Sequence, residues 1–319
     1  MSHPIFSIVT PTFNSSKYIH RVFESAASQT FRQFEWIVID DASLDDTLEI
    51  VRGYQRSAAF PISIIEKRAN RGLLDSYNIG VAAAQGEFFV GMGHDDSFKE
   101  NSLQFFWDAW NAIPLPDRHR FGSLTVQCCD ELGAVAESFP TDGMVSNFLE
   151  MYFVHKRRAE QWSIYRTDVL REFPFPSEYR LGEGVFAWFP MAERYQSRYF
   201  NAPLRIYYRD NPDSLSNNIN PRKYAREMRE VSLRMLRYTA KYSRKDIRTL
   251  VMHCARYFRF SWHANQSIFD SIKEVKGSLL CIAIIALPLA CLMVLYDHVR
   301  FLKSKKNAPL IPPPQIEHL

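Results

Sequence analysis

Residues 88–96 read FFVGMGHDD, an apolar run that ends in two adjacent carboxylates. Such a run is typical of a strand buried inside a parallel sheet. Asp95 and Asp96 would then lie at the carboxyl end of that strand, where open α/β sheets bind their ligands. Two neighbouring carboxylates repel each other unless a cation or a proton shares the site. Because Mg²⁺ is usually held by one or two carboxylates plus substrate phosphates, the pair suggests a metal carrying a diphosphate, and the alternative is a solvated turn.

The residues before this strand alternate between strand and helix patterns. Helices separate the strands by about ten residues, which predicts βαβ units, a parallel sheet and right-handed crossovers. After Asp96 the pattern changes to a helix and a hairpin, which indicates an added α+β half. The expected strands are residues 6–10, 35–39, 62–66 and 88–92, the expected helices are 17–29, 44–54 (with Ser43 as its N-cap), 73–84 and 101–112, and the expected hairpin joins 123–129 to 134–139.

Charge is unevenly placed along the 319 residues. The net charge is only +4, but residues 222–259 hold twelve Lys/Arg against three Asp/Glu. A basic helical region beside an acidic remainder suggests an anionic surface, either membrane or nucleic acid. The five cysteines are odd in number and lack CxxC spacing, so we expect reduced thiols in a cytosolic setting and no zinc site. The N-terminus has no signal-peptide pattern, so the bulk of the chain is expected to stay where it is made.

The segment Leu279–Tyr296 consists of eighteen consecutive apolar residues with Pro288 near its centre. This length is borderline for a membrane-spanning helix. Basic residues flank both ends, and a single crossing would place the more basic flank outside, against the positive-inside tendency. We therefore expect membrane association and favour a re-entrant hairpin broken at Pro288 over a full crossing. A buried core helix is the remaining alternative.

Acidic residues follow several expected strands, as Asp40-Asp41, Asp95-Asp96 and, further on, Glu183. Neither GxGxxG after a strand nor GxxxxGK[ST] occurs, which disfavours dinucleotide and P-loop sites. Carboxylates at successive strand ends instead fit a site in which one acid binds a base or ribose and another binds a metal diphosphate.

Six short motifs occur in a characteristic order. They are Pro-Thr-Phe-Asn at 11–14, Ser-Gln-Thr at 28–30, Asp-Asp-Ala-Ser at 40–43, Asn-Arg-Gly at 70–72, Asn-Ile-Gly at 78–80 and Ala-Gln-Gly-Glu at 84–87. In this order the chain resembles family 2 glycosyltransferases, the large inverting group with the GT-A fold, whose third motif is usually Asp-Asp-Gly-Ser. The resemblance extends over two-thirds of the chain, from about residue 5 to residue 216.

The resemblance implies a site for a nucleotide-sugar and for Mg²⁺ or Mn²⁺. Asp95 corresponds to the last acid of the family's Asp-x-Asp motif and would ligate the metal. Gly93 replaces the first acid of that motif, so the ion would depend on the diphosphate, on water or on Asp96. Tyr77 replaces an Arg that often precedes Asn78. The residues expected to hold the donor are Thr10, Pro11, Thr12, Asn14, Asp40, Asp41, Asn70, Gly72, Asn78, Asp96 and Arg209.

The second half of the resemblance supplies a candidate base. The family often uses the Asp of a Glu-Asp pair to deprotonate the acceptor hydroxyl, and here that Asp is Gly184. Glu183 is therefore the expected catalytic base, since Glu can act if it reaches the hydroxyl within hydrogen-bond distance. Its alternative role is a helix N-terminal Glu favoured by the dipole. Arg209 would neutralise the leaving diphosphate, with a surface salt bridge as the competing role.

The expected protein is a metal-dependent, inverting glycosyltransferase that acts on a glycan or polyprenyl-linked acceptor at the cytoplasmic face of the bacterial inner membrane. Its C-terminal segment would contact membrane lipid, and no nucleic acid is expected as partner. The alternative is a non-catalytic nucleotide-sugar-binding or scaffold protein of a polysaccharide assembly complex. The expected regions are a nucleotide-sugar-binding half (1–110), an acceptor-binding half (111–220), a basic helical region (221–276), a membrane-associated segment (277–300) and a disordered tail (301–319).

Overall fold

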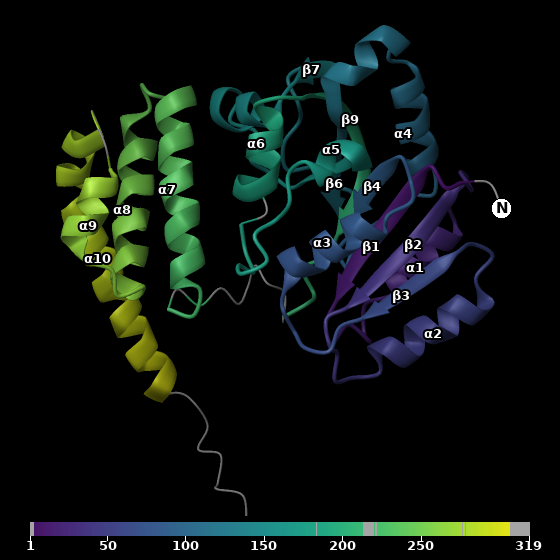
Figure 1. Ribbon diagram of the computed structural model, residues 1–319, viewed down its shortest axis with the longest axis horizontal. Coiled ribbons are helices and arrows are strands. Elements are labelled where there is room, and N and C mark those ends of the chain that lie inside the picture. The colour runs from purple at the N-terminus through teal and green to yellow at the C-terminus, as the bar shows by residue number, and fades with distance from the viewer. Residues whose placement is uncertain are drawn as a thin grey trace, which may run out of the picture. The chain divides into compact units, whose positions relative to one another are not determined.

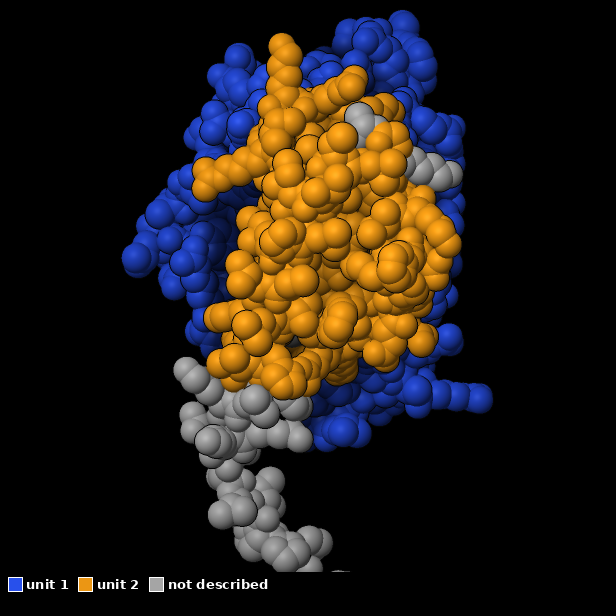
Figure 2. Space-filling model, turned by 90° about the vertical axis from the view of Figure 1, so that its left-hand side faces the viewer, with its two compact units in different colours: residues 1–219 blue, residues 220–319 orange. Residues whose placement is uncertain are grey.

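The computed structural model describes residues 3–182, 184–212, 220, 222–275, 277 and 279–306. The chain divides into two units, unit 1 (residues 1–219) and unit 2 (residues 220–319), which Figure 2 colours separately. Unit 1 holds the sheet and unit 2 is helical, as the ribbon in Figure 1 shows.

Unit 1 is built on one mixed sheet, in the order β3-β2-β1-β4-β8-β6-β9-β5, with β7 also paired to β9. The first four strands of this order run parallel, which confirms the predicted parallel half. From β4 onward most pairings are antiparallel, so the whole sheet is mixed rather than mostly parallel. The strands are β1 (Phe6–Thr12), β2 (Phe34–Asp40), β3 (Ile62–Glu66), β4 (Phe88–Gly91), β5 (Ser97–Phe98), β6 (Phe121–Asp130), β7 (Met144–Ser146), β8 (Gln161–Arg166) and β9 (Gln196–Tyr207).

The predicted hairpin after residue 123 is wrong. Strand β6 does end in a tight turn, in which the Gly133 N–H donates to the Asp130 carbonyl. Residues 134–139, however, form no strand. Both edges of β6 are already paired, one with β8 and the other with β9, so no free edge is left for a hairpin partner.

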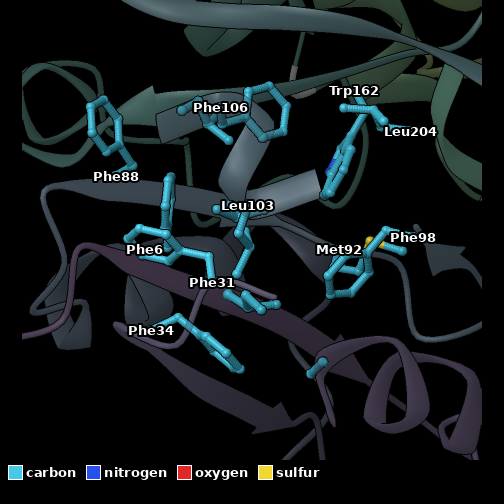
Figure 3. Packing of buried hydrophobic residues seen from close by; sticks show 14 of the residues in the cluster. Phe6, Phe31, Phe34, Phe88, Met92, Phe98, Leu103, Phe106, Trp162 and Leu204 are labelled. Carbon is cyan, nitrogen blue, oxygen red and sulfur yellow. The ribbon is translucent and has the colours of Figure 1, made fainter. Parts of the chain in front are cut away.

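Helices α1 (His20–Ala27), α2 (Thr47–Ser57) and α4 (Ser102–Asn111) cover one face of the sheet and share an aromatic core with it. Figure 3 shows Phe6, Phe88 and Phe106 gathered in that core. Helix α3 (Leu73–Ala83) contacts β1 and β2, and Gly80 allows its close approach, because a Cβ there would lie 2.3 Å from Val9 Cγ1. The remaining elements of unit 1 are the short helices η1 (Leu115–Arg120), η2 (Glu150–Val154), α5 (Thr167–Arg171), η3 (Gly184–Trp188) and α6 (Phe189–Ala192).

The predicted helices of the first 112 residues are all present, but one cap is wrong. Helix α2 begins at Thr47 rather than after Ser43. The backbone N–H of Ser43 donates instead to Asp40 Oδ2, at 3.1 Å. The polar residues that look like a helix start therefore belong to the loop that follows β2.

Unit 2 consists of α7 (Ala225–Tyr242), α8 (Ile247–His263), α9 (Ile268–Glu274) and α10 (Leu279–Lys306). Leu236, Tyr257, Phe258 and Ala286 lie in its buried core. The re-entrant hairpin is wrong, because α10 runs through Pro288 as one continuous helix. Burial of Ala286 and Ala290 on either side of the proline supports the helix there. Among the described residues, α10 alone is long and apolar enough to cross a membrane, by length and composition.

Candidate active site

Asp40, which ends β2, and Asp41, which follows it, are buried and have different partners. Asp40 Oδ1 accepts from the Thr12 hydroxyl at 3.3 Å, and Oδ2 accepts from Ser43 N. Asp41 accepts from the backbone N–H groups of Arg71 and Gly72 at 2.8 and 2.7 Å. Asp40 therefore shapes its own loop, whereas Asp41 holds the loop that follows β3.

Lys67 forms an ionic cluster with Asp41 and Asp75. Its Nζ lies 2.5 Å from Asp41 Oδ1 and 2.8 Å from Asp75 Oδ2, with only 6% of its side chain exposed. Buried carboxylates need such a partner, since an unpaired buried charge is strongly unfavourable. The cluster fixes the position of the Asn70–Gly72 loop beside the end of β2.

The loops after β1 and β2 are joined by Asn14. Its side-chain Oδ1 accepts from Leu44 N at 2.8 Å, and its backbone N–H donates to Ser43 Oγ at 3.0 Å. Asn14 (φ 50°) and Ala42 (φ 62°) both adopt left-handed backbone conformations. Ala42 stands where the resembling family has Gly, and this φ explains why Gly suits that position.

Arg180 lies across the Asn70–Gly72 loop. Its guanidinium donates to Asn70 Oδ1 and to the Asn70 carbonyl. Gly72 has φ 93°, and a Cβ there would lie 2.7 Å from Arg180 Cγ. Both the backbone conformation and the close contact therefore favour glycine at position 72.

Two predicted site residues use their polar groups inside the protein. The Thr10 hydroxyl accepts from the Trp36 indole N–H at 2.9 Å, and Thr10 is fully buried. The Asn78 amide donates to the Phe175 carbonyl at 2.7 Å and accepts from Phe175 N at 2.9 Å. Their side chains join elements of the fold, while Pro11, in the strand between Thr10 and Thr12, is half-buried.

Asp96 is held by an arginine from β9. Arg205 Nε donates to Asp96 Oδ2 at 3.0 Å, and Tyr208 N donates to Oδ1 at 3.1 Å. Burial alone would lower the pKa of the Arg205 guanidinium, but Asp96 and Glu160 raise it, so the arginine stays charged. Arg205 thus supplies one cation of the kind that the adjacent acids were expected to need, and it pairs with Asp96.

Asp95 differs from Asp96 in its surroundings. Asn211 Nδ2 donates to Asp95 Oδ2 at 2.7 Å, and 18% of the Asp95 side chain is exposed. Arg21 on α1 donates to the Asp95 carbonyl at 2.8 Å and pairs with Asp210 at 2.5 Å. The hydrogen bond from Arg21 lowers the pKa of Asp210. The segment that follows β9 is thereby held beside Asp95.

The two glycines that replace family acids have different space around them. A Cβ on Gly93 would lie 3.2 Å from both Asp95 Oδ1 and Asp96 Oδ2, which is tight. A Cβ on Gly184 would meet Trp188 Cδ1 at 3.6 Å, an ordinary contact. Glu183, the predicted base, lies outside the described residues.

Arg209 is exposed on the segment that follows β9. Its Nη2 donates to the Tyr207 hydroxyl at 3.2 Å, and its guanidinium lies over the Tyr207 ring.

The residues that sequence reasoning missed are Arg21, Lys67, Arg180, Arg205 and Asn211. Lys67 offered one signal, since it directly follows β3 as Asp41 follows β2.

Comparison with known protein families identifies a match in the first third of the chain. Residues 7–115 match the model described as "Glycosyl transferase family 2". Residues 7–115 are a glycosyltransferase family 2 domain. This range includes β1 to β4 and every predicted donor or metal residue up to Asp96.

Curated glycosyltransferases resemble the chain beyond the family 2 domain. "Poly(ribitol-phosphate) beta-N-acetylglucosaminyltransferase TarS" of Staphylococcus aureus (strain MW2) is 27% identical over 273 residues, which are 80% of this chain and 44% of that protein. The chain thus spans less than half of that relative. "GalNAc(5)-diNAcBac-PP-undecaprenol beta-1,3-glucosyltransferase" of Campylobacter jejuni subsp. jejuni serotype O:2 is 24% identical, with 67% of each chain covered.

Solved structures agree with the fold. The crystal structure of S. aureus TarS residues 1–349 in complex with UDP-GlcNAc matches with a TM-score of 0.66 at 21% identity, covering 94% of this chain and 91% of that one. Unit 1, which combines the mixed sheet with its helices and contains the family 2 domain, therefore has a GT-A fold.

The chain's own residues offer few ligands for a metal. Among the described residues, no group of three or more His, Cys, Asp or Glu side chains is placed to hold an ion. Asp95 is the one acid of its pair that is not ion-paired to arginine, and His94 Nε2 lies 4.0 Å from it. One carboxylate fits an ion whose other ligands come from a diphosphate and water, as Mg²⁺ often has.

Proposed function

We propose that this chain is a metal-dependent, inverting glycosyltransferase that moves a sugar from a nucleotide-diphosphate sugar to a lipid-linked glycan. The observation that carries the proposal is the strand order. Strands β2 and β3 lie on one side of β1 and β4 lies on the other, so the order reverses at β1. In open α/β sheets, ligands bind outside the carboxyl ends of the strands at such a point.

The residues at this point suit the two parts of a donor. The buried Asp40 ends β2 and the exposed Asn14 lies just after β1, where both would face a base and ribose. Asp95 follows β4 and would face the diphosphate. UDP-GlcNAc, bound in the TarS structure, is a donor of this kind, and the name of the C. jejuni relative contains a lipid-linked glycan acceptor.

In the proposed reaction, Glu183 removes the proton of the acceptor hydroxyl. The hydroxyl oxygen bonds to the anomeric carbon from the face opposite the nucleotide, the bond from that carbon to the diphosphate oxygen breaks, and the configuration inverts. Asp95 would hold Mg²⁺ or Mn²⁺, which when bound stabilises negative charge on the departing diphosphate. Arg209, which is exposed and lies two residues before Asn211, would neutralise the same charge.

Nucleoside diphosphate release tests this proposal. We expect release from one member of a UDP-, GDP- and dTDP-sugar panel, with Mn²⁺ or Mg²⁺ and a lipid-linked acceptor. Asp95→Asn should lower the rate at least about 100-fold, because an electrostatic contribution to such a transition state is typically worth that much. The control is Asp108→Asn, on the exposed side of α4, which should leave release unchanged. Equal rates for both variants would contradict the role of Asp95.

A non-catalytic nucleotide-sugar-binding or scaffold protein is the second candidate, favoured by Gly93 and Gly184 at positions where the family has acids. Gly184→Asp separates the two, since ordinary space exists for its Cβ. A scaffold predicts donor binding without release in the wild-type chain, and release only after this substitution. An enzyme that uses Glu183 predicts release in the wild type and its loss in Glu183→Gln.

We further propose that the protein works at the cytoplasmic face of the membrane, with unit 2 as its membrane-associated part and no nucleic acid as partner. The apolar helix α10 supports this placement by its length and composition. Binding of the full chain to vesicles, but not to DNA or RNA at the same ionic strength, is the expected result.

A further inference from the structure

Helix α10 has two different apolar faces. Its small residues Ala283, Ala286 and Ala290 are buried in the core of unit 2, against α8. The opposite face carries large side chains that are exposed, namely Ile284 (72%), Ile285 (59%), Leu292 (63%), Leu295 (60%) and Tyr296 (64%). Together with the exposed Cys281, Pro288, Cys291 and Val299, these residues recur at steps of three and four and form one continuous stripe, the exposed stripe, along the helix.

A buried ionic cluster holds α10 against α8. Asp297 accepts from Arg259 Nε and Nη2, each at 2.6 Å, and lies 2.8 Å from His263 Nε2. Asp297 is 7% exposed. Removing α10 from α8 would break this cluster and expose the alanine face, so the two helices are expected to stay together.

Helix α8 is unsuited to the bilayer interior. Arg248 and Arg256 are exposed on it, and Arg259 is half-buried. A crossing by α10 in its packed state would carry these arginines into the hydrocarbon beside it, and arginine there is costly. The packing within unit 2 therefore opposes a transmembrane orientation, although α10 has the length for one.

Aromatic side chains and a cavity extend the exposed stripe onto neighbouring helices. Trp262 on α8 and Phe269 on α9 are 65% and 73% exposed. A cavity of about 360 Å³ is lined mainly by apolar residues of unit 2, among them Phe258, Trp262, Leu287 and Leu295, and also by His298. Aromatic residues are enriched where proteins meet the membrane–water boundary. The cavity has room for part of a single hydrocarbon chain.

The charge of unit 2 complements an anionic lipid surface. Residues 220–319 contain eighteen Lys/Arg and seven Asp/Glu, a net charge of +11, whereas residues 1–219 carry −7. Basic residues near an anionic leaflet add to the attraction of an apolar helix face. A soluble protein partner has no comparable support among these observations.

We propose that unit 2 binds one leaflet of an anionic membrane with α10 lying in the membrane plane and its exposed stripe in the acyl boundary, without crossing the bilayer. The inference rests on the membrane partner of the proposed function and specifies its geometry. In this orientation both ends of α10 lie at the same depth in the membrane, whereas in a crossing orientation they would lie at opposite membrane surfaces.

Spin-label depth measurements on the full chain test this geometry. Single labels are placed at Cys281, at Cys291 and at Val299→Cys, with the other exposed cysteines changed to Ser, and vesicles contain phosphatidylcholine and phosphatidylglycerol. The outer two positions are about 27 Å apart along the helix. We expect all three labels at a similar shallow depth and a control label at Arg256→Cys in water. A depth maximum at residue 291, or water exposure of all three labels on vesicles, would overturn the proposal.

A matched pair of substitutions provides the second test. Leu292→Glu combined with Leu295→Glu should lower vesicle partitioning at least tenfold, because it places two charges on the exposed stripe. Leu115→Glu, at a 75% exposed leucine of unit 1, should leave partitioning unchanged. Unchanged partitioning of the double variant would contradict the proposal that the exposed stripe contacts the membrane. Donor hydrolysis by each variant without vesicles tests the enzymatic proposal separately, so the two proposals can fail independently.

Discussion

At the scale of single residues, the loop after β2 combines precise hydrogen bonding with one strained position. Asp40 and Ser43 bond to each other across Ala42, whose φ of 62° lies in the left-handed region. Any residue with a Cβ is disfavoured there by roughly 1–2 kcal/mol. The loop contacts of Asn14 and Asp41 hold Ala42 in this conformation.

Ala42→Gly should therefore raise the free energy of unfolding of unit 1 by about 0.5–1 kcal/mol, since relief of the strain exceeds the greater backbone entropy of unfolded glycine. Urea unfolding measures the change. The matched control, Ala109→Gly inside α4, should instead lower the free energy of unfolding by about 1 kcal/mol. A loss of stability in Ala42→Gly would show that the left-handed conformation is not strained.

The cysteines differ in reactivity for a structural reason. Burial raises the pKa of the Cys128 and Cys254 thiols to about 12, so both stay protonated until the pH approaches that value. Cys281 and Cys291 are exposed on α10. In the native protein at pH 8, we expect a disulfide reagent to modify these two rapidly, and Cys128 and Cys254 only after unfolding. Fast modification of either buried thiol would contradict this packing.

At the scale of elements, ionic contacts rather than backbone pairing place the loops around the site. Lys67 joins the ends of β2 and α3 through Asp41 and Asp75, and Arg205 joins β9 to the turn after β4 through Asp96. These side chains are nearly buried, so each contact fixes a loop position strongly. Exposed pairs on the same elements have much less effect on stability.

Lys67→Met should lower the free energy of unfolding by about 3–5 kcal/mol, because it leaves the buried Asp41 carboxylate without a cation and leaves Asp75 only the exposed Arg71, 3.8 Å away. The control is Arg52→Met, which removes an exposed pair between α2 and Glu66 of β3 and should cost less than about 1 kcal/mol. Denaturant unfolding of both variants provides the comparison. Similar losses in the two would indicate that the Lys67 cluster is no more important than a surface pair.

At the scale of the whole molecule, charge divides along the boundary between the units. Unit 1 carries −7 and holds the carboxylates of the site, and unit 2 carries +11 and holds the apolar helix. The proposed donor diphosphate is itself anionic, so a cation bound as proposed at Asp95, together with the arginines near it, would offset an unfavourable field.

Vesicle binding by the full chain should weaken as NaCl rises from about 0.1 to 1 M, because the screening length falls from about 10 to 3 Å. Binding should not vanish at 1 M, since the exposed stripe of α10 is not screened by salt. Co-sedimentation with anionic vesicles measures both features. Binding that is independent of salt would contradict the electrostatic contribution, and complete loss at 1 M would contradict the apolar one.

Local sequence pattern was sufficient for the parallel half of the sheet. Strands β1 to β4 and the helices between them follow from hydrophobic periodicity, and the order of short motifs indicated the GT-A fold. The acids at the end of β2 were also predictable, because Asp40 and Asp41 directly follow the apolar run, whereas the role of Ser43 was not, since its N–H donates to Asp40 and it does not cap a helix. Such features depend on neighbours within a few residues.

Only the tertiary structure decided which of these acids remains available to a ligand. Asp96 meets Arg205 across 109 residues of chain, Asp95 meets Asn211 across 116, and Thr10 and Asn78 turn their polar groups toward Trp36 and Phe175. Helix α10 likewise continues through Pro288, where Ala286 and Ala290 are buried in the core of unit 2. Long-range partners of this kind arise when distant strands and helices are brought together, and a one-dimensional pattern does not contain that information.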